Sequence, residues 1–102
     1  MSVIQSVIAE EYERNQRMQK TYQEELLNFP RGSIGKKKVK NHDYFYWVYR
    51  ENGKVINKYI SAKKNDIEFL IEQIKKRQHI QQLIVKLKKE QTEMQRYMRG
   101  IK

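Results

Sequence analysis

The sequence predicts an α+β fold: an N-terminal helix, a three-stranded antiparallel β-meander and one long C-terminal helix. Three observations indicate it. Apolar residues recur at three- and four-residue steps in residues 3–29 and again in residues 63–99, which is the spacing of amphipathic helices. Between these segments, residues 33–60 alternate in character and contain Asn52-Gly53, a dipeptide typical of tight hairpin turns. We expect one domain overall, built from residues 1–30, 31–62 and 63–102.

The first helix is expected over residues 3–28. Its apolar stripe consists of Val3, Ile4, Val7, Ile8, Tyr12, Met18, Tyr22, Leu26 and Phe29. Ser2 is a candidate N-cap, because its hydroxyl can accept a hydrogen bond from the first turn. Pro30 disfavours a helical conformation at the residue before it, and Gly32 follows closely, so the helix should end there.

A β-meander is expected from Ser33 to Ile60. Folding at Asn52-Gly53 predicts one face with the pairs Arg50–Val55, Val48–Asn57 and Tyr46–Tyr59. It predicts a second face with the pairs Tyr49–Ile56, Trp47–Lys58 and Phe45–Ile60. A second two-residue turn at Asn41-His42 would add the segment IGKKKVK as a third strand. In that register the opposing pairs are Val39–Tyr44, Lys37–Tyr46 and Lys36–Trp47.

The second helix is expected from Lys63 to about Arg99. Its stripe consists of Ile67, Leu70, Ile71, Ile74, Ile80, Leu83, Ile84, Leu87, Met94 and Met98. A helix of about 36 residues is roughly 55 Å long, which exceeds what a small sheet can cover. The remainder should form an antiparallel helical pair with the first helix, or a coiled coil with another copy. Glutamines near the seam, Gln78, Gln81 and Gln91, suggest a thin interface that sets the helix register.

The composition predicts a thin core and an anionic partner. Only 38% of the 102 residues are hydrophobic and 33% are charged. The net charge of +10 is concentrated in the middle: residues 31–64 contain ten Lys/Arg against two Asp/Glu. Residues 1–30 contain three against five, and residues 65–102 contain nine against five. Such a basic block attracts polyanions, of which nucleic acid is the most common, although it could also serve only as a solubilising surface.

The middle segment combines these cations with aromatic residues, five of them between positions 44 and 49. Two helices can bury only one face of a small sheet, so one aromatic set should stay exposed, and exposed aromatic patches usually bind a ligand. The candidate phosphate contacts are Lys36, Lys37, Lys38, Lys40, Arg50, Lys54 and Lys58. The candidate base-stacking rings are Tyr46, Trp47 and Tyr49.

Three questions about this sheet stay open at the level of sequence. The outward face could carry Tyr44, Tyr46 and Tyr59, or instead Phe45, Trp47 and Tyr49. The ribbon could lie in a nucleic-acid groove and read base edges with Arg50 and Asn57. Cross-strand tyrosine pairs covered by lysine stems also stabilise small sheets without any ligand.

Little in the sequence indicates catalysis, so we expect a non-enzymatic protein without a metal or cofactor. Cysteine is absent, and the two histidines, His42 and His79, fall on different predicted elements. The segment RGSIG lacks the spacing of a phosphate-binding loop. The N-terminus has no signal-peptide pattern, and no apolar run approaches the roughly 20 residues of a membrane span. We therefore expect a cytoplasmic protein that does not bind membranes.

The segment NFPRGSIGKKKVKNHDYFYWVYRENGKVINKYISAK resembles a motif of small bacterial and phage-associated proteins. Their pattern is LPKGS, a basic strand, YYY and then YREGGKVKSKYIG, followed by a long helix. Two positions depart from it: Asn52 and Ser61 stand where glycine is usual. Asn52 preserves the turn chemistry, whereas Ser61 leaves the end of the third strand uncertain. The resemblance implies a fold, since the family is a domain of unknown function.

The expected function is non-catalytic binding of RNA or DNA. Similar hairpins near transposase and integrase ends imply the same role. The phage association implies an alternative, an anti-CRISPR-type inhibitor that binds a nuclease effector or its guide RNA. A third alternative is a helical oligomerisation or scaffold module, with a homodimer formed through the helices.

Overall fold

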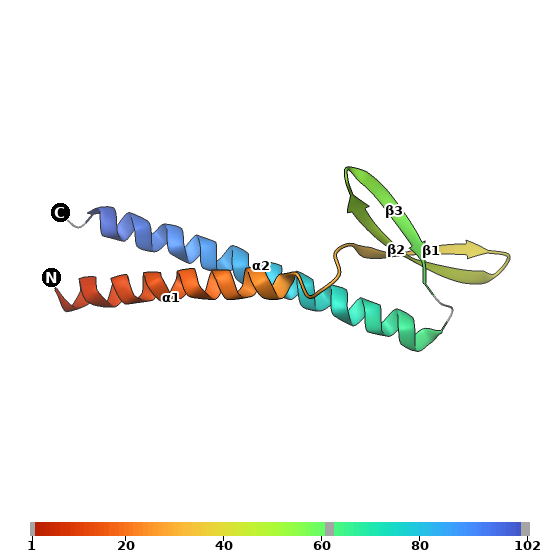
Figure 1. Cartoon of the computed structure of the whole chain (residues 1–102), viewed down its shortest axis with the longest axis horizontal. Helices are drawn as coiled ribbons and strands as arrows, with labels where there is room; N and C mark the ends of the chain where they lie inside the picture. Colours follow the sequence, from red (N-terminus) through yellow and green to blue (C-terminus); the bar gives the residue numbers. More distant parts are fainter. Residues whose placement is uncertain (1, 61–62, 101–102) are drawn as a thin grey trace. The chain divides into compact units, whose positions relative to one another are not determined.

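The computed structural model describes residues 2–60 and 63–100 and confirms the α+β class (Figure 1). The elements follow the predicted order: α1 (Val3–Leu26), β1 (Ser33–Val39), β2 (His42–Glu51), β3 (Lys54–Tyr59) and α2 (Lys64–Gly100). The chain divides into two units. The helix-pair unit contains residues 1–28 and 79–102, and the sheet unit contains residues 29–78. The long helix α2 therefore contributes to both.

The first helix begins at the predicted cap. The Ser2 hydroxyl accepts a hydrogen bond from the Gln5 backbone N–H (3.2 Å), and the Gln5 side chain accepts one from the Ser2 N–H (3.0 Å). This reciprocal capping box satisfies two N–H groups that have no partner within the helix. At the other end α1 stops at Leu26, two residues earlier than expected, and two i→i−3 backbone bonds tighten the chain through Asn28.

In the helix-pair unit, α1 runs antiparallel to the C-terminal part of α2 (Figure 1). The residues of the predicted α2 stripe that lie here, from Ile80 to Met98, are all buried or half-buried. On α1, by contrast, the buried residues are polar, Asn15 and Gln19. The first three residues of the predicted α1 stripe, Val3, Ile4 and Val7, are exposed.

The polar residues of α1 form a hydrogen-bond ladder across the helix pair. Asn15 donates from Nδ2 to the Leu87 carbonyl (2.8 Å) and accepts from Gln19 Nε2 (2.6 Å). Gln19 also donates to Gln91 Oε1 (2.9 Å), which confirms a seam position for Gln91. The Tyr12 hydroxyl accepts from the side-chain amides of Gln91 and Gln95. Since such bonds form only at one alignment, the ladder sets the register of the two helices.

The sheet has the predicted strand order β1-β2-β3, and the β2–β3 register is confirmed at every predicted pair within the strands. Tyr46 lies opposite Tyr59, Trp47 opposite Lys58 and Arg50 opposite Val55. Asn52 and Gly53 both have positive φ angles, 52° and 77°, as a type I′ turn requires. The Ile60 N–H donates to the Phe45 carbonyl (2.9 Å), which extends the pairing by one bond. Ser61, at which the strand end is uncertain from sequence, lies outside the described residues.

The predicted β1–β2 register is wrong by two residues. The turn lies at Lys40-Asn41, with φ angles of 50° and 66°, rather than at Asn41-His42. Its observed pairs are Val39–His42, Lys37–Tyr44, Lys36–Phe45, Gly35–Tyr46 and Ile34–Trp47. A shift of two residues leaves every side chain on the same face, so the alternation in the sequence does not distinguish the two registers. Asn41 tolerates the left-handed conformation in either turn.

The part of α2 that belongs to the sheet unit contains the buried residues Ile67 and Ile74. Arg77 Nη1 donates to the Phe29 carbonyl (2.9 Å), which ties this helix to the segment before β1. Burial, and secondarily the charge of Arg31, lower the pKa of Arg77 from its ordinary value.

In the described part of the chain, no helix has both the length and the apolar character needed to cross a membrane.

Candidate nucleic-acid interface

The register assigns the sheet residues to two faces, because side chains alternate along a strand and directly opposed residues share a face. We call one the tyrosine face; it carries Lys37, Val39, Tyr44, Tyr46, Arg50, Val55 and Tyr59. We call the other the tryptophan face; it carries Ile34, Lys36, Lys38, Phe45, Trp47, Tyr49, Lys54, Ile56 and Lys58. Asp43 and Glu51 also lie on the tryptophan face.

Exposure distinguishes the two faces. Three large apolar side chains of the sheet are strongly exposed: Val39 (50%), Val55 (56%) and Tyr59 (55%). All three lie on the tyrosine face. On the tryptophan face, the aliphatic and aromatic side chains Ile34, Phe45, Trp47, Tyr49 and Ile56 are half-buried. Tyr44, Tyr46 and Val48 on the tyrosine face are half-buried as well, so this face is the more open of the two because of Val39, Val55 and Tyr59. The sequence leaves this difference undecided.

The rings of the tryptophan face are already engaged within the sheet unit. Trp47 Nε1 donates to the Arg31 carbonyl at 2.6 Å. The Trp47 and Tyr49 rings stack with their centroids 4.1 Å apart and their planes tilted by 31°. The Lys58 ammonium lies 6.0 Å from the Trp47 centroid and 5.9 Å from that of Tyr49, at cation–π distance. These contacts reduce the area of the Trp47 and Tyr49 rings that is open to a stacking base.

The lysines of β1 lie in a two-stranded extension of the sheet, which we call the basic ribbon (residues 36–45). It exists because β3 pairs only with residues 46–51 of β2, whereas β1 pairs with residues 42–48. Lys36, Lys37, Lys38 and Lys40 are all exposed there. Lys36 Nζ approaches Asp43 Oδ2 at 3.4 Å, a solvent-exposed pair that contributes little stability. The ribbon therefore presents cations on both of its faces and at its turn.

The structure thus brings together only part of the predicted site. Of the ten candidate residues, Lys37, Tyr46 and Arg50 lie on the tyrosine face, and Lys40 lies at the ribbon turn. The other six lie on the tryptophan face: Lys36, Lys38, Trp47, Tyr49, Lys54 and Lys58. Among those six, Lys36 and Lys38 still belong to the basic ribbon.

Four aromatic or exposed apolar residues of the tyrosine face were not among the ten candidates: Val39, Tyr44, Val55 and Tyr59. The β2–β3 pairing deduced from Asn52-Gly53 was sufficient to join Tyr59 to Tyr46. The sequence does not indicate which face of the sheet is more exposed, because both faces carry aromatic and aliphatic residues.

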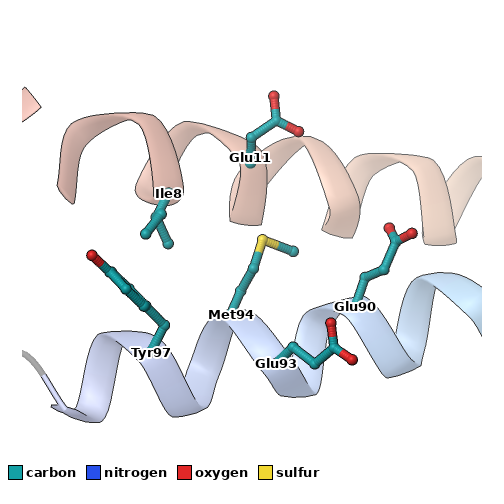
Figure 2. Close-up of a pocket in the computed structure, with 6 residues that line it drawn as sticks. All are labelled: Ile8, Glu11, Glu90, Glu93, Met94 and Tyr97. Atoms are coloured by element: carbon teal, nitrogen blue, oxygen red, sulfur yellow. The ribbon is translucent and has the colours of Figure 1, made fainter. Parts of the chain in front are cut away.

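A separate hollow lies in the helix-pair unit, between α1 and α2 (Figure 2). It has a volume of about 440 Å³ and is lined by Ile8, Met94 and Tyr97 together with three carboxylates, those of Glu11, Glu90 and Glu93. Glu11 pairs with Arg14 at 3.7 Å on α1. Within residues 2–60 and 63–100, no three His, Asp or Glu side chains gather closely enough to hold a metal ion. The hollow is thus an acidic-edged apolar surface on a basic chain.

Comparison with known families gives one match. Residues 3–68, more than half of the chain, match the family described as Domain of unknown function (DUF6788). The chain belongs to this family. The DUF6788 match includes α1, the whole sheet and the start of α2, in agreement with the expected resemblance to a small domain of unknown function. No curated protein and no solved structure matches the chain, so the functional argument for this DUF6788 member rests on its geometry.

Proposed function

We propose that this protein binds nucleic acid without catalysis, through the basic ribbon and the adjoining tyrosine face. The observation that supports it most is the position of four exposed lysines next to exposed apolar and aromatic side chains on one small sheet. Lysines neutralise backbone phosphates and release counterions, and aromatic rings stack on bases. The resemblance of the hairpin to phage-associated proteins supports a role in a mobile genetic element.

Removing the ribbon lysines should weaken binding much more than removing lysines elsewhere. The test variant replaces Lys37, Lys38 and Lys40 with glutamine, which leaves the Lys36–Asp43 pair intact. The control replaces Lys20, Lys88 and Lys89, three exposed lysines of the helix-pair unit, so that the net charge changes equally. We expect at least a tenfold loss of affinity for the ribbon variant and less than threefold for the control, measured by fluorescence anisotropy with labelled oligonucleotides.

A salt titration adds a second measure. For the ribbon variant, the slope of log affinity against log salt concentration should fall in magnitude by about two to three. Each lost phosphate contact lowers the magnitude of this slope by about 0.7–0.9, and three lysines are removed. Equal losses of affinity in the ribbon variant and the control would mean that the whole basic surface attracts nucleic acid and that the ribbon is not a specific site. Absence of binding to RNA and DNA, with binding to a nuclease effector instead, would favour the inhibitor role.

A second candidate function is self-assembly through the helices, and exposed apolar residues of the helix-pair unit favour it. Val3, Ile4 and Val7 are exposed by 80%, 60% and 51% on α1, the helix that supplies Ile8 to the hollow. On α2, Lys86 lies one helical turn before Glu90, which lines the hollow. An antiparallel pair of α2 helices centred on Lys88 would place Lys86 of each copy opposite Glu90 of the other. We therefore propose a second copy of this chain as the occupant of this surface.

If this is so, the double variant Ile4→Glu/Val7→Glu should convert a dimer into a monomer, because the new carboxylates would be buried at the interface. Multi-angle light scattering after gel filtration measures the mass directly. Leu27→Glu/Val85→Glu is the matched control: these residues are 80% and 67% exposed, and neither lines the hollow. A wild-type protein that is monomeric at high micromolar concentration would contradict this second function.

A further inference from the structure

The tyrosine face contains a continuous aromatic cluster centred on Tyr59. The Tyr59 ring lies 6.2 Å from that of Tyr44 and 5.9 Å from that of Tyr46, centroid to centroid. The ring planes are tilted by 50° and 69°, so Tyr59 meets its neighbours obliquely. Neither neighbour stacks flat on it, and it is 55% exposed. More than half of the accessible surface of Tyr59 is therefore open, so a planar ligand can reach this residue.

The strand next to this cluster has a glycine opposite Tyr46, with the Val48 side chain beside it. Gly35 lies directly opposite Tyr46 on β1. A Cβ at Gly35 would approach Val48 Cγ2 to 3.1 Å, so even a methyl group would crowd this surface. A side chain at position 35 would therefore displace Val48 next to Tyr46.

Cations flank the cluster on the same face. The Lys37 ammonium lies 5.9 Å from the Tyr46 centroid. Arg50 lies on the same face of β2, four positions after Tyr46. No ion pair involving Lys37 or Arg50 occurs within the described residues. This face therefore combines an accessible ring with positive charges that no carboxylate neutralises.

From this arrangement we infer that the nucleic acid is single-stranded and that unpaired bases stack on Tyr59 and Tyr44. The inference rests on the proposed nucleic-acid binding and narrows its ligand class. In a duplex, the faces of the bases are covered by their neighbours in the stack, so an aromatic cluster finds no surface there. In a single strand each base offers a free face, and stacking on tyrosine is tolerant of sequence. Lys37 and Arg50 then contact the phosphates on either side.

The test compares one labelled 20-nucleotide strand without self-complementarity, as DNA and as RNA, with the same strand annealed to its complement. All forms are titrated with the full-length protein at one salt concentration. We expect the single strand to bind at least tenfold more tightly than the duplex. The DNA and RNA arms show whether the 2′-hydroxyl contributes, which this stacking argument does not require.

Variants locate the stacking surface. Tyr59→Ala should reduce single-strand affinity by about tenfold and duplex affinity by less than twofold, while Tyr59→Phe retains binding because the ring remains. Phe69→Ala, which removes a 63% exposed aromatic ring from α2, should leave both affinities unchanged. Because Trp47 is the single tryptophan and lies in the sheet unit, its fluorescence checks that the Tyr59 variants keep the sheet folded.

Each outcome has a distinct meaning. Equal or tighter binding of the duplex overturns the single-strand inference and points to the ribbon entering a groove, while nucleic-acid binding itself stands. A loss in Phe69→Ala as large as in a folded Tyr59→Ala variant overturns the assignment to the tyrosine face. Failure of every oligonucleotide to bind removes the proposed function, and this inference with it.

Discussion

Replacing Asn15 with aspartate is expected to destabilise the helix pair by about 3 kcal/mol at neutral pH. Asn15 is 4% exposed, and its amide Nδ2 donates to the Leu87 carbonyl at 2.8 Å. A carboxylate at this position would place a buried negative charge against the Leu87 carbonyl oxygen. Gln19 could still donate to it, but the hydrogen bond to Leu87 would lose its donor. The free energy of unfolding, measured by urea denaturation with circular dichroism, should fall accordingly.

The loss should depend on pH in a defined direction. Burial would raise the pKa of the introduced carboxyl above its unfolded value of about 3.9, because the protonated form can donate to Leu87 and avoids the charge. The destabilisation relative to wild type should be smallest below about pH 4. It should grow as the pH rises from the unfolded pKa to the folded one and stay constant above it. Asn28→Asp, at an exposed position, is the control and should change stability by less than about 1 kcal/mol. A pH-independent loss would mean that Asn15 does not bond to Leu87.

Replacing Gly32 with alanine is expected to destabilise the sheet unit by at least about 3 kcal/mol. Gly32 has a φ of 102°, a conformation that L side chains rarely adopt, and it directly precedes β1. An added Cβ would lie 2.1 Å from the Val48 carbonyl oxygen and 2.9 Å from Tyr49 Cβ. Since the nearest atom belongs to the backbone of the central strand, relief requires β1 and β2 to move apart.

Gly53→Ala separates the backbone strain from this clash. Gly53 also has a positive φ, 77°, but nothing lies within 4 Å of the position that an added methyl group would take. We expect it to cost about 1 kcal/mol. Urea denaturation followed by Trp47 fluorescence reports on the sheet unit for both variants. A Gly32→Ala protein as stable as Gly53→Ala would show that the chain before β1 does not approach Val48 as described.

If the tyrosine face binds single strands and the helix pair joins two copies, the two units have separable functions. The ribbon-lysine variant should then change the affinity for nucleic acid but not the mass of the protein. Ile4→Glu/Val7→Glu should change the mass but not the affinity. A variant that loses both would indicate that binding depends on assembly, since two linked sites on one strand bind more tightly than one.

Short-range patterns were enough to determine the elements of this protein from sequence. The spacing of apolar residues predicted both helices, Ser2 predicted the cap of α1, and Asn52-Gly53 predicted the β2–β3 register. Each of these signals depends on neighbours within a few positions, where backbone geometry limits the choices strongly. The β1–β2 register failed because a two-residue shift preserves the faces, and nothing local distinguishes Lys40-Asn41 from Asn41-His42 as the turn.

Which surfaces are buried was decided by tertiary structure alone. Tyr46 and Trp47 are adjacent in sequence and both half-buried, yet Tyr46 contacts the exposed Tyr59 ring, whereas Trp47 donates to the Arg31 carbonyl. Asn15 and Gln19 are polar, yet they are the buried residues of α1, because partners 72 residues away, Leu87 and Gln91, satisfy their amides. A residue's own chemistry indicates what it can bind. Whether it is free to do so depends on contacts that only the folded chain brings together.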